Sequence, residues 1–310
     1  MLAYVTGSAG FVGGWLTAHL RERGDTVVAV DAEVEVTDAT AVRESLTSVS
    51  PEVVYHLAGL AHVGRSWDDP VSTFTVNALG TLSVLEAAAA CRLPPRVLVV
   101  SSSEVYGSAG GAPVSEEAPL RPVSPYAASK VAAEYLALQA YLGRSVPVVR
   151  VRPFNHVGPG QAPDFVVSAL ARRIVAAEAA GGGEVAVGNL EARRDFTDVR
   201  DVVRAYRLLA ERGVPGEAYN VASGRVHPIA EVAERLVALA TAEVTLVEDP
   251  DLVRPVDVPV LAGDASKLVA ATGWTPLIEL GETLADVMEH WRSKAGPGTG
   301  AKRPASSEGG

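Results

Sequence analysis

The sequence of 310 residues has little cysteine and no long apolar run. Its single cysteine, Cys91, excludes an internal disulfide and suits a reducing compartment. No apolar run approaches the ~20 residues of a membrane span. The opening MLAYVTGSAG also reaches glycine too soon for a signal peptide. We therefore expect a cytoplasmic protein without membrane association.

Basic charge is also scarce, because 27 lysines and arginines face 37 acidic residues, for a net charge of -10 at pH 7. This balance argues against nucleic acid or an anionic membrane as a partner. Any anionic ligand must then be held by a few placed arginines. The six histidines and one cysteine show no ligand spacing, so we expect no metal site.

What the chain does have is a repeating pattern of short apolar runs and amphipathic stretches, with 48% hydrophobic residues overall. The runs predict buried strands at Leu2–Val5, Thr26–Val30, Val53–Leu57, Arg96–Val100 and Pro147–Val151. The stretches between them predict helices near Phe11–Arg23, Val71–Cys91 and Pro125–Leu142. This alternation indicates an α/β fold with a doubly wound parallel sheet, which binds ligands beyond the carboxyl ends of its strands.

A glycine-rich turn follows the first predicted strand. In VTGSAGFVGGWL, Gly7, Gly10 and Gly13 have GxxGxxG spacing, and a helix containing Phe11 and Val12 follows the first strand here. Glycine lets the backbone turn tightly and approach a pyrophosphate, and the helix N-terminus offers N–H groups and a positive dipole end. The pattern predicts a dinucleotide site, with a tight turn that binds nothing as the alternative.

Asp31 ends the second predicted strand, 18 residues after Gly13. An acidic residue at about this distance is the usual partner of the adenine-ribose hydroxyls. Its charge would repel a 2′-phosphate, so NAD(H) is favoured and NADP(H) remains possible. The span DAEVEVTDAT before the next helix is short and leaves the adenine pocket poorly determined.

The alternation of apolar runs and amphipathic stretches changes after residue 155, which suggests two lobes of about 150 residues each. We expect a dinucleotide-binding domain over residues 1–155 and a smaller substrate-binding lobe over 156–293. The stretch 196–220, with a helix near Arg200–Leu209, should return to the sheet. The C-terminal residues 294–310 read as a disordered tail.

The segment SPYAASK places Tyr126 and Lys130 four residues apart, on one face of a helix that Pro125 can begin. A lysine ammonium beside a phenol favours phenolate, so we expect a tyrosine pKa below its usual value of about 10. Tyr126 would then serve as a general acid or base. Ser102, at the end of the preceding strand, can hydrogen-bond the same substrate oxygen. The alternative is an ordinary amphipathic helix with a surface tyrosine and lysine.

Taken together, these segments resemble the extended short-chain dehydrogenase/reductase family, also called the NAD-dependent epimerase/dehydratase family. The resemblance covers the chain to about Arg292. The motifs that carry it are TGSAGFVG, HLAG, VNALGT, SSSEVYG, YAASK and RPFNHVGPGQ.

The resemblance implies roles for matching residues. Tyr126 would be the proton donor or acceptor at the sugar oxygen, and Ser102 would polarise the carbonyl. Lys130 would hold the nicotinamide ribose and tune Tyr126. Ala58 would line the nicotinamide ribose, and Asn77 would be a structural or cofactor-side polar group. The family's habit is a homodimer formed through sheet-flanking helices.

Three further segments, RPFNHVGPGQAPDFV, VGNLEARRDFTDVRDVV and RPVDVPVLAGDASKLVAATGWTP, resemble the GDP-mannose branch, with GDP-4-keto-6-deoxy-D-mannose reductases as the nearest group. This implies that Asn155, Arg194 and Arg254 grip the diphosphate of a nucleotide sugar, as arginine forks suit phosphate oxygens. Arg225 would be a fourth anchor, and His62 would border the sugar. The alternatives are surface salt bridges and a structural histidine.

Glu104 follows Ser102 and Ser103 at the end of a buried strand. An ionised carboxylate is costly to place there unless it has a functional role or is solvated. In the dehydratases that the chain resembles, this carboxylate removes the proton alpha to a transient 4-keto group. The 4-keto reductases also retain a glutamate here, so its presence does not decide between them.

The hypothesis that follows is NAD(P)H-dependent reduction of GDP-4-keto-6-deoxy-D-mannose to GDP-D-rhamnose or its C4 epimer. The first alternative is a GDP-mannose 4,6-dehydratase, in which Glu104 would be essential. The second is a nucleotide-sugar 4-epimerase. A catalytically silent dinucleotide sensor is the third, and the presence of Ser102, Tyr126 and Lys130 argues against it.

Overall fold

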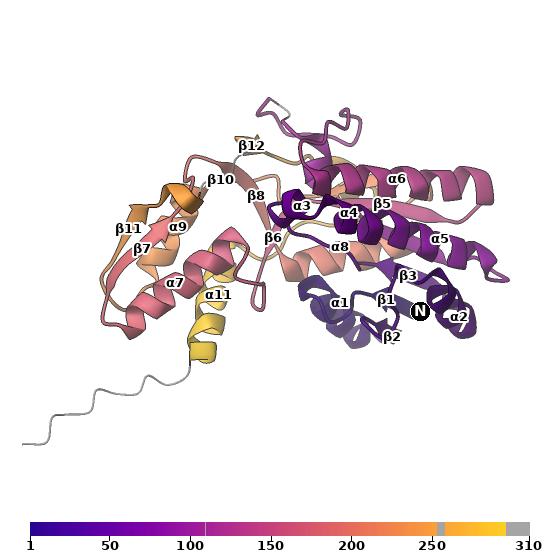
Figure 1. The fold of residues 1–310 in the computed structure, drawn as a ribbon, viewed down its shortest axis with the longest axis horizontal. Helices are drawn as coiled ribbons and strands as arrows, with labels where there is room; N and C mark the ends of the chain where they lie inside the picture. Colours follow the sequence, from indigo (N-terminus) through magenta and orange to yellow (C-terminus); the bar gives the residue numbers. More distant parts are fainter. Residues whose placement is uncertain (109, 253–257, 296–310) are drawn as a thin grey trace, which may run out of the picture.

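The computed structural model describes residues 1–108, 110–252 and 258–295. Figure 1 shows two bodies, a larger one built around a sheet with helices on both sides and a smaller one containing β7 (Gly183–Val187), β11 (Val244–Glu248) and α7 (Val166–Ala179). Arg254 and residues 296–310 lie outside the described residues.

Among the described residues, the larger sheet has six strands in the order β2-β1-β3-β4-β5-β9, and every neighbouring pair is parallel. This confirms the predicted fold class. The predicted strands are all present, with ends that move by one or two residues. The strands are β1 (Leu2–Thr6), β2 (Thr26–Val30), β3 (Val53–His56), β4 (Arg96–Val100), β5 (Val148–Pro153) and β9 (Ala218–Val221).

Helices cover both faces of this sheet. On one face lie α1 (Phe11–Glu22) and α8 (Val199–Arg212), and on the other lie α2 (Ala39–Val49), α5 (Gly80–Ala90) and α6 (Pro125–Arg144). Because α8 leads into β9, the chain returns to the large sheet after its first excursion into the smaller body.

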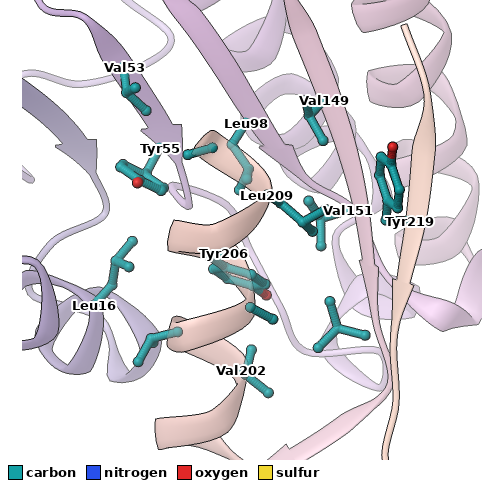
Figure 2. Packing of buried hydrophobic residues seen from close by; sticks show 14 of the residues in the cluster. Leu16, Val53, Tyr55, Leu98, Val149, Val151, Val202, Tyr206, Leu209 and Tyr219 are labelled. Carbon is teal, nitrogen blue, oxygen red and sulfur yellow. The ribbon is translucent and has the colours of Figure 1, made fainter. Parts of the chain in front are cut away.

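Alternate residues of each strand supply the two cores, as expected for strands buried on both faces. Tyr4 packs with one core and its neighbour Val5 with the other. Figure 2 shows Tyr206 and Leu209 of α8 facing the strands, with Leu209 next to Val151.

The predicted helix at Val71–Cys91 is not one regular α-helix. It consists of α4 (Pro70–Phe74), a π-helical turn at Thr75–Leu79 and α5. Such π-turns insert an extra residue into a helix and are frequent at functional sites. Apolar periodicity gives no sign of this turn, because both helix types bury one face.

The smaller body has its own apolar core, where α7, α9 (Ile229–Ala238) and α11 (Leu280–Ala295) pack around the paired strands β7 and β11. Since α11 continues through Ala295, the predicted tail begins too early, and Lys294 and Ala295 belong to a helix.

The remaining elements connect the two bodies or flank the large sheet, and among them β8 pairs with β6, β10 and β12. They are β6 (Asn155–Val157), β8 (Arg193–Asp198), β10 (Val226–Pro228), β12 (Val260–Leu261), α3 (Arg65–Asp68), α10 (Ser266–Thr272) and the 3₁₀ turns Ser103–Tyr106 and Pro250–Leu252. Within the described ranges, none of the helices combines the length and apolar character needed to cross a membrane.

Candidate active site

The turn between β1 and α1 is closely packed at two glycines. Gly7 has φ of +67°, and a Cβ there would lie 2.7 Å from the amide nitrogen of Ala58. A Cβ on Gly13 would lie 2.1 Å from the carbonyl oxygen of Gly7, so only glycine fits either place. Gly10 is the N-cap of α1 and leaves the first-turn N–H groups without a side-chain cap. This backbone cradle fits the pyrophosphate of a dinucleotide.

The side chains of Phe11 and Val12 serve packing, because both contact the core beneath α1. The Phe11 ring also stacks on the ring of His156, with centroids 6.2 Å apart and an interplanar angle of 8°. Any cofactor role of these two residues would therefore come from their backbone N–H groups.

Asp31 lies beside the same turn. Its carboxylate accepts a hydrogen bond from the N–H of Ala9 at 2.8 Å, and its own N–H donates to Glu33 at 3.0 Å. The sequence from Gly24 to Val42 contains no lysine or arginine. The surroundings of Asp31 along the chain are therefore acidic.

A chain of hydrogen bonds runs beneath the cradle. The Thr6 hydroxyl accepts from the N–H of Ala58 at 3.2 Å and contacts Nδ1 of His56 at 2.9 Å. On the other side of the ring, Nε2 contacts the Thr81 hydroxyl at 2.9 Å, and that hydroxyl donates to the carbonyl of Asn77 at 2.6 Å. These directions require the His56 proton on Nε2. Burial lowers the pKa of His56 to about 3, so the ring is neutral, as the chain requires.

Asn77 sits in the π-helical turn and is almost fully buried. Its amide pairs with both backbone groups of Leu60, at 2.8 and 3.0 Å, and donates to the Ser129 hydroxyl at 2.9 Å. Ser129 in turn donates to the carbonyl of Tyr126 at 2.7 Å. Asn77 therefore ties the loop after β3 to α6, which is one of the two roles expected for it.

Tyr126 and Lys130 are both buried on α6, at the carboxyl end of β4. The Lys130 ammonium donates to the carbonyl oxygen of Val100 at 3.0 Å and lies 6.0 Å from the centroid of the Tyr126 ring. Ser102 lies close enough to the Tyr126 phenol to act on its pKa, which it lowers. The structure thus brings together Ser102, Tyr126 and Lys130.

The expected direction of the Tyr126 pKa shift is wrong. Burial raises the pKa of Tyr126 to about 12; the nearby Ser102 hydroxyl opposes the rise and the negative charge of Glu104 adds to it. Burial also lowers the pKa of Lys130 to about 8, opposed by Glu134. Desolvation is the largest cause of both pKa shifts, and residue spacing alone cannot reveal burial. A protonated phenol at neutral pH is suited to donate a proton.

Ser102 is also the N-cap of the 3₁₀ turn Ser103–Tyr106, and its hydroxyl accepts from the N–H of Glu104 at 3.2 Å. Glu104 is half-buried. The end of that turn is held by Tyr106, whose hydroxyl donates to Asn220 at 2.7 Å. Glu104 therefore projects from a fixed turn next to the phenol whose pKa it raises.

Two of the residues expected to bind substrate, Asn155 and Arg194, lie on the strands β6 and β8. Asn155 begins β6, opposite Phe196 of β8. Arg194 of β8 is buried and donates to the carbonyls of Val258 at 2.7 Å and Arg193 at 2.9 Å. The two predicted residues are therefore on adjacent strands, and Arg194 already holds main-chain oxygens.

Arg225 and His62 have protein partners. Arg225 is exposed and forms an ion pair with Glu279, the alternative considered for it. The His62 ring packs against the Phe165 ring, with centroids 6.2 Å apart. The Nδ1 atom of His62 accepts a hydrogen bond from the N–H of Arg65 at 3.0 Å. His62 thus touches the start of the smaller body.

Sequence patterns gave no sign of several residues that hold the site together. Thr6 and Ser66 act through single hydroxyls on backbone groups of other segments, and the Thr81 hydroxyl joins the His56 ring to the carbonyl of Asn77 in its own helix. Isolated threonines and serines are common in any sequence, so no spacing rule singles them out. His56 begins the HLAG motif, and its position in a predicted buried strand is the one signal in the sequence that points to it.

A family model described as GDP-mannose 4,6 dehydratase matches residues 32–287, which is more than half of the chain. The protein is an enzyme of the extended short-chain dehydrogenase/reductase class, and the predicted resemblance is confirmed. Within that class, the chain belongs to the GDP-mannose 4,6 dehydratase family.

Individual relatives have different activities. The chain is 36% identical to the GDP-6-deoxy-D-mannose reductase of Pseudomonas aeruginosa over 296 residues, which cover 94% of this chain and 97% of the relative. A structure of RMD from Pseudomonas aeruginosa complexed with NADPH has a TM-score of 0.87 and 34% identity, covering 95% and 100% of the two chains. The UDP-glucose 4-epimerase of Thermus thermophilus, complexed with NAD, has a TM-score of 0.84 and 30% identity, covering 94% and 99%.

Proposed function

We propose that this protein reduces the 4-keto group of a GDP-4-keto-6-deoxyhexose with NAD(P)H, converting GDP-4-keto-6-deoxy-D-mannose to GDP-D-rhamnose. The observation that carries the proposal is the buried phenol of Tyr126, which stays protonated at neutral pH and lies near Ser102 and Lys130 at the end of β4. Similarity to a reductase over nearly the whole length of both chains supports the reaction direction.

In this reaction a bound reduced nicotinamide would supply hydride to C4 of the sugar. Ser102 and Tyr126 would hold the ketone oxygen, and Tyr126 would give its proton to that oxygen as negative charge develops there. Positioned acid catalysis of this kind contributes typically about 10²–10⁴-fold to rate. Lys130, fixed by the carbonyl of Val100, would hold the nicotinamide ribose.

NADH is the proposed reductant. Asp31 is held beside the cradle by the N–H of Ala9, where a carboxylate can accept from ribose hydroxyls and would repel a 2′-phosphate. The acidic stretch from Gly24 to Val42 has no basic side chain that could pair with such a phosphate. Of the two similar structures, one holds NADPH and the other NAD.

We propose that the two bodies bind different ligands. Residues 1–155, together with 196–220, would bind the dinucleotide, and most of 156–293 would bind the nucleotide sugar. Asn155 and Arg194 lie on adjacent strands, β6 and β8, and would hold the diphosphate, with Arg225 and Arg254 as further anchors. Use of Arg225 would require its ion pair with Glu279 to open.

A GDP-mannose 4,6-dehydratase is the second candidate, and Glu104 is the residue that it would require as its base. The carboxylate is close enough to Tyr126 to raise the pKa of the phenol, as a base acting beside the keto group would be. The family model that matches the chain is itself named for the dehydratase. A 4-epimerase would need Ser102, Tyr126 and Lys130 but not this glutamate.

The reductase is tested by mixing purified protein, NADH and GDP-4-keto-6-deoxy-D-mannose and following the loss of NADH absorbance. We expect turnover with one NADH consumed per sugar reduced. Turnover by wild-type protein but not by Tyr126→Phe would support the proposal. NADH binding without oxidation for a panel of keto-sugar nucleotides would instead indicate the dinucleotide sensor.

We also propose a cytoplasmic homodimer. Three apolar side chains on α4 and the π-helical turn are exposed: Val71 by 74%, Phe74 by 39% and Leu79 by 55%. These elements lie next to α6 in Figure 1. The three side chains line a groove with Pro70, Thr75 and Ala78. A self-complementary pairing of two copies would cover this surface.

Light scattering on Leu79→Glu tests the dimer, with Leu277→Glu, at a 70% exposed position elsewhere, as the matched control. We expect only the first substitution to produce monomers. Dimers that persist in Leu79→Glu, or a monomeric wild type, would contradict the proposed interface.

A further inference from the structure

The first turn of α6 is held by two serine hydroxyls that come from different segments. Ser124, the N-cap, accepts from the N–H of Ala127 at 3.1 Å. Pro125 has no N–H. The N–H of Tyr126 donates to the hydroxyl of Ser66 at 3.1 Å, although Ser66 lies 60 residues earlier in the chain. Helix N-termini need such external acceptors, because their first N–H groups have no intrahelical partner.

Ser66 is almost fully buried, and both hydrogen-bonding directions of its hydroxyl are used. Its own proton goes to the carbonyl of Val63 at 2.6 Å, which leaves the oxygen lone pairs for the N–H of Tyr126. The carbonyl of Tyr126 is held as well, by the hydroxyl of Ser129 at 2.7 Å. Both backbone groups of the proposed proton donor are therefore fixed by serines.

The turn that carries Ser66 is itself anchored to the smaller body. Arg65, the neighbour of Ser66 on α3, forms an ion pair with Asp164 at 2.7 Å. His62, whose ring accepts the N–H of Arg65, packs against Phe165, the residue before α7. A continuous set of contacts thus runs from the start of α7 through α3 to the backbone of Tyr126.

We infer that Ser66 is a positioning residue for Tyr126: it fixes the backbone from which the phenol reaches the substrate oxygen and links that position to the smaller body. This inference rests on the proposed reductase function. Because proton transfer requires close alignment of the reacting atoms, a small displacement of the phenol lowers the rate of chemistry more than it lowers binding. Ser66 would act on kcat without touching substrate.

The test compares Ser66→Ala with Ser124→Ala. Each variant removes one hydroxyl acceptor from the first turn of α6, so the losses of helix capping are matched. We expect Ser66→Ala to lower kcat by about tenfold or more, with KM for the keto-sugar nucleotide and Kd for NADH within about threefold of wild type. Ser124→Ala should keep kcat within about twofold of wild type. Ser66→Thr, which retains the hydroxyl, should recover most of the lost kcat.

Equal kcat losses in both alanine variants would show that α6 merely needs capping and would overturn the inference. So would an unchanged kcat in Ser66→Ala. Breaking the link with Asp164→Asn should reproduce part of the kcat loss, and a wild-type kcat there would remove the connection to the smaller body.

A second readout needs no substrate and separates this inference from the proposed function. The protein has eight tyrosines, so selective ¹⁵N-tyrosine labelling gives a simple amide spectrum, and Tyr126→Phe identifies the Tyr126 signal. Ser66→Ala should speed hydrogen exchange at the Tyr126 amide, whereas Ser124→Ala should not. If wild-type protein turns over no keto-sugar nucleotide but the exchange rates behave as expected, the function is wrong and the placement of Tyr126 by Ser66 stands. Unchanged exchange in Ser66→Ala contradicts the placement.

Discussion

The ammonium of Lys130 donates a hydrogen bond to the carbonyl oxygen of Val100, at 3.0 Å, from a buried position at the end of β4. Burial lowers the pKa of this lysine to about 8, well below the usual value for a free side chain. A buried ammonium is costly, and here its place is beside the phenol proposed to donate the proton. The Lys130 ammonium therefore lowers the stability of the folded protein at a place where it serves the proposed reaction.

Lys130→Met should stabilise the protein at neutral pH. The folded-state pKa of Lys130 is depressed, so the unfolded chain binds the extra proton between pH 8 and about 10.5, and wild-type stability falls as the pH drops through this window. The advantage of the methionine variant should be on the order of 1–3 kcal/mol at pH 7 and should shrink toward about pH 10. Urea unfolding at both pH values measures it, and a difference independent of pH would contradict the account.

Tyr126→Phe should remove most of kcat while leaving NADH affinity unchanged, because the hydroxyl acts in the transition state and the ring still packs. The expected loss is about 10²–10⁴-fold. Tyr135→Phe is the control, since Tyr135 is 60% exposed on the same helix. Steady-state kinetics with NADH fluorescence titration would show the split. Weakened NADH binding with kcat preserved would contradict the assigned role.

Asp31→Asn should narrow the preference for NADH over NADPH. Removing the charge relieves the repulsion of a 2′-phosphate, so KM for NADPH should fall, while KM for NADH should rise as a ribose acceptor weakens. Glu44→Gln, an exposed site on α2, supplies a control with the same loss of charge. A wild-type protein that already prefers NADPH would overturn the reading of Asp31.

Glu104→Gln separates the two candidate reactions. A dehydratase needs the carboxylate as a base, so the variant should lose almost all activity, whereas reduction requires only the proton of Tyr126 and should be mildly affected. The kcat of ketone reduction and the yield of keto sugar from GDP-mannose, each compared between variant and wild type, report the difference. A severe loss of ketone reduction in Glu104→Gln would contradict the proposed mechanism.

Two buried tyrosines should respond to phenylalanine in opposite ways. In the described part of the structure, the Tyr206 hydroxyl is buried without a hydrogen-bond partner, so Tyr206→Phe should be neutral or stabilising. The Tyr106 hydroxyl donates to Asn220 and accepts from Arg152 at 2.9 Å. Removing the hydroxyl takes a donor from the buried Asn220 oxygen and an acceptor from Arg152, which keeps its bonds to Glu134, so Tyr106→Phe should cost about 1–3 kcal/mol. Thermal and urea unfolding compare the two variants directly, and equal changes in the free energy of unfolding would contradict the prediction.

The parts of the fold that depend on local pattern could be predicted from sequence. Apolar runs located the sheet strands, and the close packing of Gly7 and Gly13 is the reason that glycines recur there. The i, i+4 spacing of Tyr126 and Lys130 correctly placed both on one side of α6. These features involve residues close in sequence, so short-range geometry is enough to find them.

The features that depend on burial or on distant pairing could not be predicted. Asn77, in the π-helical turn, pairs with Leu60 and Ser129, and no periodicity encodes these contacts. The rise in the Tyr126 pKa comes from desolvation, and spacing to Lys130 carries no information on burial. The approach of Ser66 to Tyr126 likewise requires the folded sheet to bring α3 and α6 together.

The most direct test of the central claim is a product analysis by mass spectrometry in two parallel incubations. With NADH and GDP-4-keto-6-deoxy-D-mannose, the account predicts a GDP-6-deoxyhexose that has gained two hydrogens. With GDP-mannose and no added reductant, it predicts unchanged starting material. Formation of the keto sugar from GDP-mannose alone, with no reduction in the first incubation, would contradict the claim and identify a dehydratase.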